Sequence, residues 1–144
     1  MKPVDVYLSL GSNQGDRQAL IDEALRRLDA AIGRPYAALS SVIETPAWGF
    51  DGPAFLNCVV RYRTARQPHT LLRICKRIER AMGRRETLEY GADGRRIYHD
   101  RPIDIDILLY GDERVDTPEL QIPHPLMQQR DFIMRPLNEI FAQK

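Results

Sequence analysis

The sequence predicts an α+β fold built on one antiparallel sheet, and two kinds of pattern support this. Four segments alternate apolar and polar residues with a period of two, which is typical of strands. Two longer segments repeat apolar residues at helical spacing. Their order is β-α-β-β-α-β with a short helical C-terminal tail, which is the order of the ferredoxin-like plan. We expect a single domain, residues 1–144, with the helices on one side of the sheet.

The first half of the chain supplies the first strand, the first helix and the second strand. Residues 4–10 alternate and predict a half-buried strand, which the polar residues 11–16 interrupt. A helix over 20–32 follows and ends at Gly33, because glycine favours the left-handed conformation that closes helices. Residues 38–44 predict the second strand.

The second half continues the same order. Residues 55–62 predict a strand, and residues 68–82 place their apolar side chains on one helical face. Gly83 is a suitable residue to end that helix. The last main strand is expected over 103–110, and the helical tail over 126–141.

Composition excludes several classes of protein. The formal net charge of +1 argues against a general nucleic-acid binder, which carries a large basic excess. No apolar run approaches membrane-spanning length, and a strand pattern begins at once, so neither a membrane span nor a signal peptide is expected. Cys58 and Cys75 are expected to be buried and reduced. We therefore expect a cytoplasmic protein.

The segment Ile103-Asp104-Ile105-Asp106-Ile107 carries the strongest chemical signal. Its isoleucines occupy one face of a strand and its two aspartates the other. Carboxylates about 7 Å apart on one strand face can hold hard cations, which in turn bind phosphate oxygens. The alternative is an ordinary solvated strand face.

An arginine-rich segment runs into that strand and favours a polyphosphate site, because guanidinium groups suit bidentate phosphate contacts. Four acidic residues dilute its charge, so a solvated loop of mixed charge is the alternative. Its arginines are Arg84, Arg85, Arg95, Arg96 and Arg101.

No phosphate-binding loop of the form GxxxxGK[ST] is present, which excludes a P-loop kinase. Instead, seven short motifs follow one another between residues 4 and 140: Gly11-Ser12-Asn13, Thr45-Pro46-Ala47-Trp48-Gly49, Phe55-Leu56-Asn57, Ile78-Glu79 through Gly83-Arg84, Arg101-Pro102-Ile103-Asp104-Ile105-Asp106-Ile107, Ile122-Pro123-His124-Pro125 and Arg130-Asp131-Phe132. In this order they resemble the hydroxymethyl-dihydropterin pyrophosphokinases of folate biosynthesis.

The resemblance implies a magnesium-dependent diphosphokinase that transfers the pyrophosphoryl group of ATP to 6-hydroxymethyl-7,8-dihydropterin, giving AMP and the pterin diphosphate. It implies two Mg²⁺ ions, with ATP as co-substrate. The expected partners are these small molecules, with no nucleic acid, membrane or obligate protein partner.

The resemblance also assigns site residues. The implied metal ligands are Asp104 and Asp106, which with Arg84 and Arg101 form the implied catalytic set. The implied ATP contacts are Lys76, Glu79, Arg84, Arg101, Ile107, His124 and Arg130. The implied pterin contacts are Thr45, Pro46, Trp48, Phe55, Asn57 and Phe132.

Each motif alone has an ordinary structural explanation. Phe55 and Phe132 are equally compatible with a core, Gly11-Ser12-Asn13 with a turn and helix cap, and His124 with a surface turn. Two other functions stay open: an RNA-binding module, although no strand carries the usual aromatic signature of that class, and a two-metal phosphohydrolase that uses the same aspartates.

Overall fold

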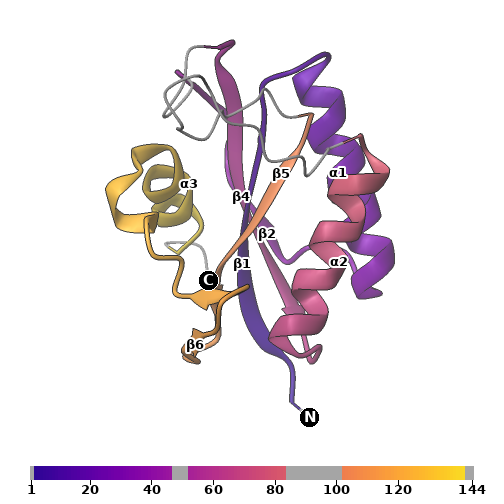
Figure 1. Cartoon of the computed structure of the whole chain (residues 1–144), viewed down its shortest axis with the longest axis vertical. Helices are drawn as coiled ribbons and strands as arrows, with labels where there is room; N and C mark the ends of the chain where they lie inside the picture. Colours follow the sequence, from indigo (N-terminus) through magenta and orange to yellow (C-terminus); the bar gives the residue numbers. More distant parts are fainter. Residues whose placement is uncertain (1, 47–51, 84–101, 142–144) are drawn as a thin grey trace.

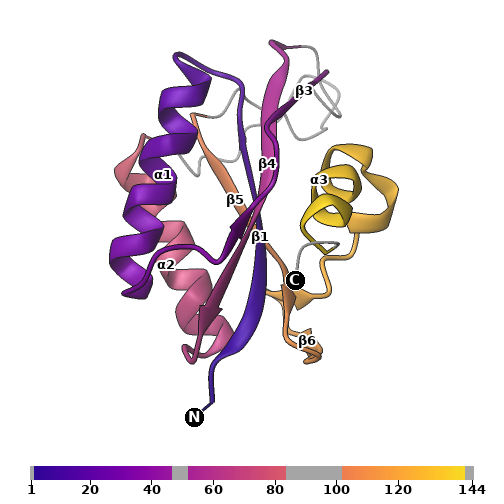
Figure 2. The same cartoon turned by 180° about the vertical axis from the view of Figure 1, so that it is seen from behind.

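The computed structural model describes residues 2–46, 52–83 and 102–141. Its main sheet is antiparallel, with strand order β2-β4-β1-β5 (Figure 1). A further strand, β3, pairs with the first residues of β4, along the same edge as β2 (Figure 2). The strands are β1 (Val4–Ser12), β2 (Ala38–Leu39), β3 (Ile43–Thr45), β4 (Phe55–Thr64) and β5 (Asp104–Tyr110). The predicted α+β class is confirmed. The second predicted strand is two short strands, because the hydroxyl of Ser40 accepts the Val59 N–H between them.

Helices α1 (Arg17–Ile32) and α2 (Pro68–Ala81) cover one face of the sheet (Figure 1). The side chain of Asp16 accepts the Ala19 N–H at 3.1 Å and so caps the start of α1. Both predicted glycine ends are confirmed, since Gly33 has φ 92° and Gly83, just after α2, has φ 102°. The helices end where a residue free of Cβ adopts the left-handed conformation.

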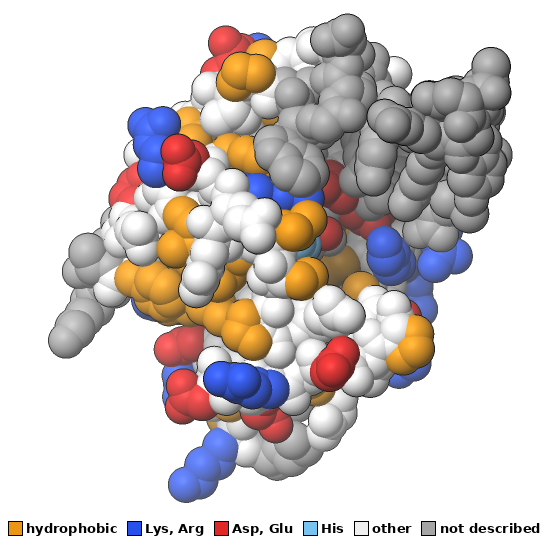
Figure 3. All heavy atoms as spheres, turned by 60° about the vertical axis from the view of Figure 1, so that its left-hand side comes forward, with side chains coloured by type: hydrophobic (Ala, Val, Ile, Leu, Met, Phe, Trp, Pro, Cys, Tyr) orange, Lys and Arg blue, Asp and Glu red, His pale blue; other side chains and the backbone are white. Residues whose placement is uncertain are grey.

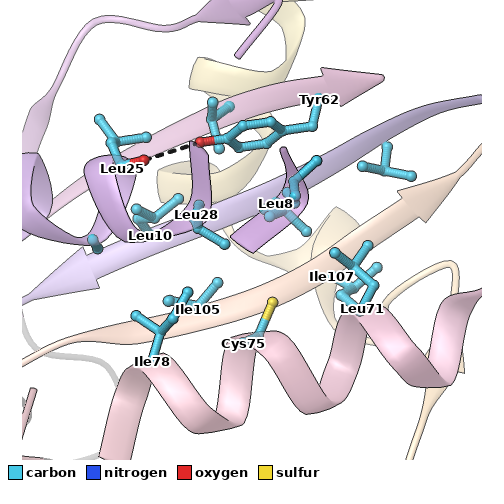
Figure 4. Close-up of a cluster of buried hydrophobic side chains, with 14 of the residues drawn as sticks. Leu8, Leu10, Leu25, Leu28, Tyr62, Leu71, Cys75, Ile78, Ile105 and Ile107 are labelled. Carbon is cyan, nitrogen blue, oxygen red and sulfur yellow. Dashed lines mark hydrogen bonds between the residues drawn. The ribbon is translucent and has the colours of Figure 1, made fainter. Parts of the chain in front are cut away.

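The first core fills the space between the sheet and these two helices. Figure 4 shows leucines of β1 and α1 facing Cys75 and Ile78 of α2, with Ile105 and Ile107 of β5 between them. The hydroxyl of Tyr62 donates to the Leu25 carbonyl at 3.3 Å. Cys58 and Cys75 are buried and free, as expected.

Helix α3 (Asp131–Phe141) lies on the opposite face of the sheet from α1 and α2 (Figures 1 and 2). It forms a second core, whose buried members are Tyr7, Ala38, Val59, Leu108, Met127, Ile133, Leu137 and Ile140. The expectation of helices on one side therefore holds for α1 and α2 but is wrong for the C-terminal helix. The prediction that the first strand is buried on one face only is also wrong in part. Helix α3 packs against its other face and leaves Tyr7 only 8% exposed.

The remaining elements link β5 to α3. A two-stranded sheet pairs β6 (Val115–Asp116) with β7 (Gln121–Ile122), and a 3₁₀ helix, η1 (Met127–Gln129), precedes α3. No helix among the described ranges is long and apolar enough to cross a membrane.

Strand β5 contains a bulge that changes the face of the sheet on which its last side chains lie. Ile107 pairs with Leu8, whereas Leu109 pairs with the neighbouring Tyr7, so Leu108 is the extra residue. Tyr110 consequently returns to the first core, and Leu108 joins the second. Upstream of the bulge, Asp104 and Asp106 share the α3 face with Leu108.

The second core should contribute strongly to stability. Leu137 is fully buried, so Leu137→Ala is expected to lower the free energy of unfolding by about 2–5 kcal/mol through lost burial and a cavity. The exposed neighbour Asn138 provides a control, because Asn138→Ala should change it by less than about 0.5 kcal/mol. Urea denaturation followed by circular dichroism measures both, and equal effects would mean that α3 adds little to the fold.

Candidate functional site

One aspartate and one asparagine lie in a row across three strands. Gly11 of β1 pairs with Asn57 of β4 on one side and with Asp104 of β5 on the other. Residues directly opposite each other in an antiparallel sheet share a face. This is the α3 face, because Val59, two residues after Asn57, belongs to the second core. Asp106, opposite Ser9, follows in the next row.

Gly11 is needed at the centre of this row. A Cβ at this position would lie 2.9 Å from Oδ1 of Asn57 and 3.4 Å from Cδ1 of Phe55. Any larger residue would therefore displace the Asn57 amide. The structure also corrects the expected turn at residues 11–16, because β1 continues through Ser12.

Asn57 is held by its neighbour on β3. Nδ2 of Asn57 donates to Oγ1 of Thr45 at 2.7 Å, and Asn57 is only 7% exposed. Thr45 itself pairs with Phe55, which is half-buried and belongs to neither core. These three residues thus form a partly enclosed group at one end of the sheet. Pro46 is exposed beside them, and Trp48 lies outside the described residues.

The start of α1 fastens this end of the sheet. Nδ2 of Asn13 donates to the Pro53 carbonyl at 3.2 Å. Nη1 of Arg17 donates to the Ala54 carbonyl at 2.8 Å, and Nη2 lies 2.7 Å from Oε2 of Glu44 on β3. Asn13 therefore holds the entry to β4 and does not cap the helix.

Sequence reasoning gave Arg17 no role. A single basic residue in the first turn of a helix carries no signal of its contacts with a distant loop and strand. Only the fold reveals that this side chain contacts both β3 and the residue that precedes β4.

His124 lies beside β5, because its backbone N–H donates to the Leu108 carbonyl at 3.1 Å. Its Nδ1 accepts the Leu126 N–H at 3.3 Å, so the neutral ring carries its proton on Nε2. Burial and the positive charge of Arg130 lower the pKa of His124, while the negative charge of Asp104 acts in the opposite direction. The ring is therefore within electrostatic reach of both charges.

Arg130 immediately precedes α3, and its guanidinium carbon lies 5.6 Å from the ring centroid of Phe132. This distance allows a cation–π interaction. Phe132 is half-buried and packs against the second core. The structural explanation for Phe132 is thus correct in part, since one residue both packs the core and lies beside Arg130.

The predicted residues of α2 take different positions. Nζ of Lys76 lies 3.7 Å from Oε1 of Glu79, and Lys76 is half-exposed. Glu79 is fully buried, and its Oε2 accepts the Ile105 N–H at 2.8 Å. Ile107 turns its side chain into the first core, away from the face with the aspartates. Arg84 and Arg101 lie outside the described residues.

Acidic and basic side chains gather around a recess on the face shown in Figure 3. Within residues 2–46, 52–83 and 102–141, no three His, Cys, Asp or Glu side chains are grouped so as to hold a metal ion. The Asp104–Asp106 pair supplies hard oxygen donors, so a cation there would need further oxygen ligands from water or a bound anion.

The fold and this recess define an α+β protein whose carboxylates, amide, histidine and aromatic rings belong to one sheet face, an arrangement suited to a polar small molecule. The family model of 7,8-dihydro-6-hydroxymethylpterin-pyrophosphokinase matches residues 7–142. The chain belongs to this family.

Curated relatives agree with this membership. The chain is 48% identical to the 2-amino-4-hydroxy-6-hydroxymethyldihydropteridine pyrophosphokinase of Porphyromonas gingivalis, over 94% of this chain and 89% of that protein. It is 42% identical to the protein of the same name from Aquifex aeolicus, over 94% of this chain and 79% of that protein. The Bacillus subtilis protein is 36% identical, over 95% and 78% respectively.

The electrostatics around His124 can be tested without ligands. NMR titration of the free protein should give His124 a pKa below its ordinary value of 6.5, because burial disfavours the charged ring. Arg130→Met should raise this pKa by removing a repelling charge, whereas Asp104→Asn should lower it further. Shifts of the opposite sign would mean that these two charges do not face the ring.

Proposed function

We infer that the residues gathered on the α3 face carry out the reaction of this family, the transfer of the pyrophosphoryl group of ATP to the hydroxyl of hydroxymethyl-dihydropterin in folate biosynthesis. The products are AMP and the pterin diphosphate. The single observation that supports the assignment is the row Asn57–Gly11–Asp104, in which an amide and a carboxylate flank the same glycine on one sheet face.

The β3–β4 end of the row is the proposed pterin site. The Asn57 amide offers both a donor and an acceptor, which suits a ring that presents both along one edge. Thr45 orients that amide, and Phe55 stands next to it. We propose that Phe55 and Phe132 stack on the two faces of the ring, with Pro46 and Trp48 completing the pocket.

The β5 end is the proposed phosphate site. Two carboxylates on one face provide the oxygen donors that magnesium prefers, so the residues present fit this ion. Asp104 and Asp106 would hold it, with ATP supplying further oxygens, and we propose two ions. A cation held there would supply positive charge to offset the charge of the phosphates.

Side chains around the carboxylates would orient ATP. His124 presents its Nε2–H as a neutral donor, and Arg130 carries a permanent positive charge. Lys76, half-exposed on α2, is a further proposed nucleotide contact on the basis of the sequence. Arg84 and Arg101 remain proposed phosphate clamps on the basis of the sequence. Since such a transfer offers little covalent work to the protein, its main contributions are positioning and charge neutralisation.

We further infer a ferredoxin-like scaffold and a cytoplasmic location. The strand order β2-β4-β1-β5 with α1 and α2 on one face supports the first. The two buried, unpaired cysteines support the second, because free thiols are usual in reducing compartments.

The metal assignment predicts loss of turnover without loss of fold. Asp106→Asn should reduce AMP formation from ATP and hydroxymethyl-dihydropterin by about 100-fold or more, because the amide cannot replace a charged ligand. Asp112→Asn, in the exposed turn after β5, is the matched control and should retain full activity. A coupled AMP assay at varied magnesium measures both. Near-normal activity of Asp106→Asn would refute the assignment.

The pterin assignment predicts a selective loss of affinity. Asn57→Ala should weaken pterin binding by about 10- to 100-fold, since a buried polar edge left unpaired costs about 1–3 kcal/mol. Affinity for a non-hydrolysable ATP analogue should change far less. Calorimetric titration of each ligand separates the two effects, and equal losses for both would place Asn57 in the scaffold.

A further inference from the structure

Glu79 is a carboxylate placed inside the first core. It lies near the end of α2, one helical turn after the buried Cys75, and is 0% exposed. An ionised carboxylate is costly to bury unless hydrogen bonds and an opposite charge compensate it. An apolar residue would fill this position at lower cost, so a carboxylate here calls for a specific role.

The contacts of Glu79 supply both forms of compensation. Oε2 accepts the Ile105 N–H at 2.8 Å, and Oε1 lies 3.7 Å from the Lys76 ammonium. Strand β5 stands at the end of the strand order. Alternate N–H groups of an edge strand point away from the sheet and have no strand to bind. Glu79 accepts the one that belongs to the residue between the two aspartates.

The hydrogen bond from Ile105 to Glu79 restrains residues 104–106 on the side of β5 that faces away from β1. Asp104 and Asp106 are registered against Gly11 and Ser9 of β1, whereas Ile105 is bound to α2. A hydrogen bond to an ionised acceptor is about twice as strong as a neutral one. Ligand constellations need their groups held within about 0.5 Å of the productive geometry. A peptide held from both edges meets that need better than a free edge strand.

The charge of Glu79 also reaches this region of the core. Burial raises the pKa of the Cys75 thiol, and the negative charges of Glu79 and then Asp106 raise it further. Both carboxylates therefore act on the same sulfur atom.

We propose that Glu79 is a positioning residue for the Asp104–Asp106 pair: its buried carboxylate holds the Ile105 N–H and so fixes the direction of both aspartates. This inference rests on the proposed function, in which the two aspartates hold magnesium together with ATP. In this role Glu79 acts through β5, by a route separate from the ATP contact that the resemblance implies.

Three substitutions separate the hydrogen bond from the charge. Glu79→Gln keeps an acceptor and loses the charge, Glu79→Asp keeps the charge on a shorter side chain, and Glu79→Met fills the space with no carbonyl acceptor. The Asp and Met variants should raise the magnesium concentration for half-maximal turnover about 10-fold or more, the usual effect of losing a group that orients metal ligands. The Gln variant should stay within about threefold of the wild type.

Two NMR measurements do not depend on turnover. Hydrogen exchange at the Ile105 amide should be faster in the Asp and Met variants and stay slow in the Gln variant. The amide signals of residues 104–106 should respond to magnesium, in the presence of a non-hydrolysable ATP analogue, only at correspondingly higher concentrations in the Asp and Met variants.

Cys75→Ala is the matched control, because it removes buried atoms from the same helix face without touching the Ile105 N–H. It should lower the free energy of unfolding and leave the magnesium requirement unchanged. A Met variant with wild-type magnesium requirement and Ile105 exchange would overturn the inference, as would a loss confined to ATP affinity at saturating magnesium. If the Met variant does not fold, the Gln and Asp pair decides the question by the same readouts.

Failure of this inference is distinguishable from failure of the proposed function. If Asp106→Asn retains turnover, the metal assignment itself is wrong. If Asp106→Asn is inactive while all three Glu79 variants behave as the wild type, only the positioning role is wrong.

Discussion

Because Gly11 pairs with Asn57 on one side and with Asp104 on the other, a slip of β1 by one residue against either neighbour would separate the two halves of the site. The side-chain period of a strand is two, so such a slip would also turn a whole set of core residues toward the wrong face. Leu8 and Leu10 are fully buried against α1 and α2, and this burial fixes the register. The packing of the first core therefore also fixes which residues lie side by side on the opposite face of the sheet.

Local charge, and not the net charge of +1, prepares this face for anionic ligands. Asp104 and Asp106 are only partly buried, which keeps the cost of their charges low, whereas the fully buried Glu79 needs a hydrogen bond and a nearby ammonium. His124 is kept neutral by burial and by Arg130, so the ring can donate a hydrogen bond without adding charge. Among the described residues, this arrangement combines the permanent charge of Arg130 with the neutral donor His124 and the pair of aspartates.

Much of the fold followed from the sequence because period-two alternation and terminal glycines are local signals. They located the main strands, the two ends at Gly33 and Gly83, and the common face of Asp104 and Asp106. The side of the sheet that α3 covers did not follow, since an apolar helix face does not specify its partner surface. The burial of Glu79 was also hidden, because a glutamate beside an apolar stripe has the same pattern whether it faces solvent or a strand edge. The sequence also contained no sign that the motifs Gly11-Ser12-Asn13 and Phe55-Leu56-Asn57 lie against each other, since their close approach required the structure.

The length of α3 explains why a recess exists on its face of the sheet. The helix has 11 residues and is therefore about 16 Å long, whereas β4 has 10 residues and spans about 33 Å. Even a helix aligned with the strand would leave about half of it uncovered. The residues packed against α3 include Tyr7, Val59 and Leu108, while Phe55, Asn57 and the aspartates lie toward the other end of the same sheet face. The aspartates there are only partly buried, whereas Asn57 is buried with its amide bonded to Thr45. A longer C-terminal helix would cover the aspartates as well, so among the described residues the short length of α3 is what leaves them partly exposed on this face.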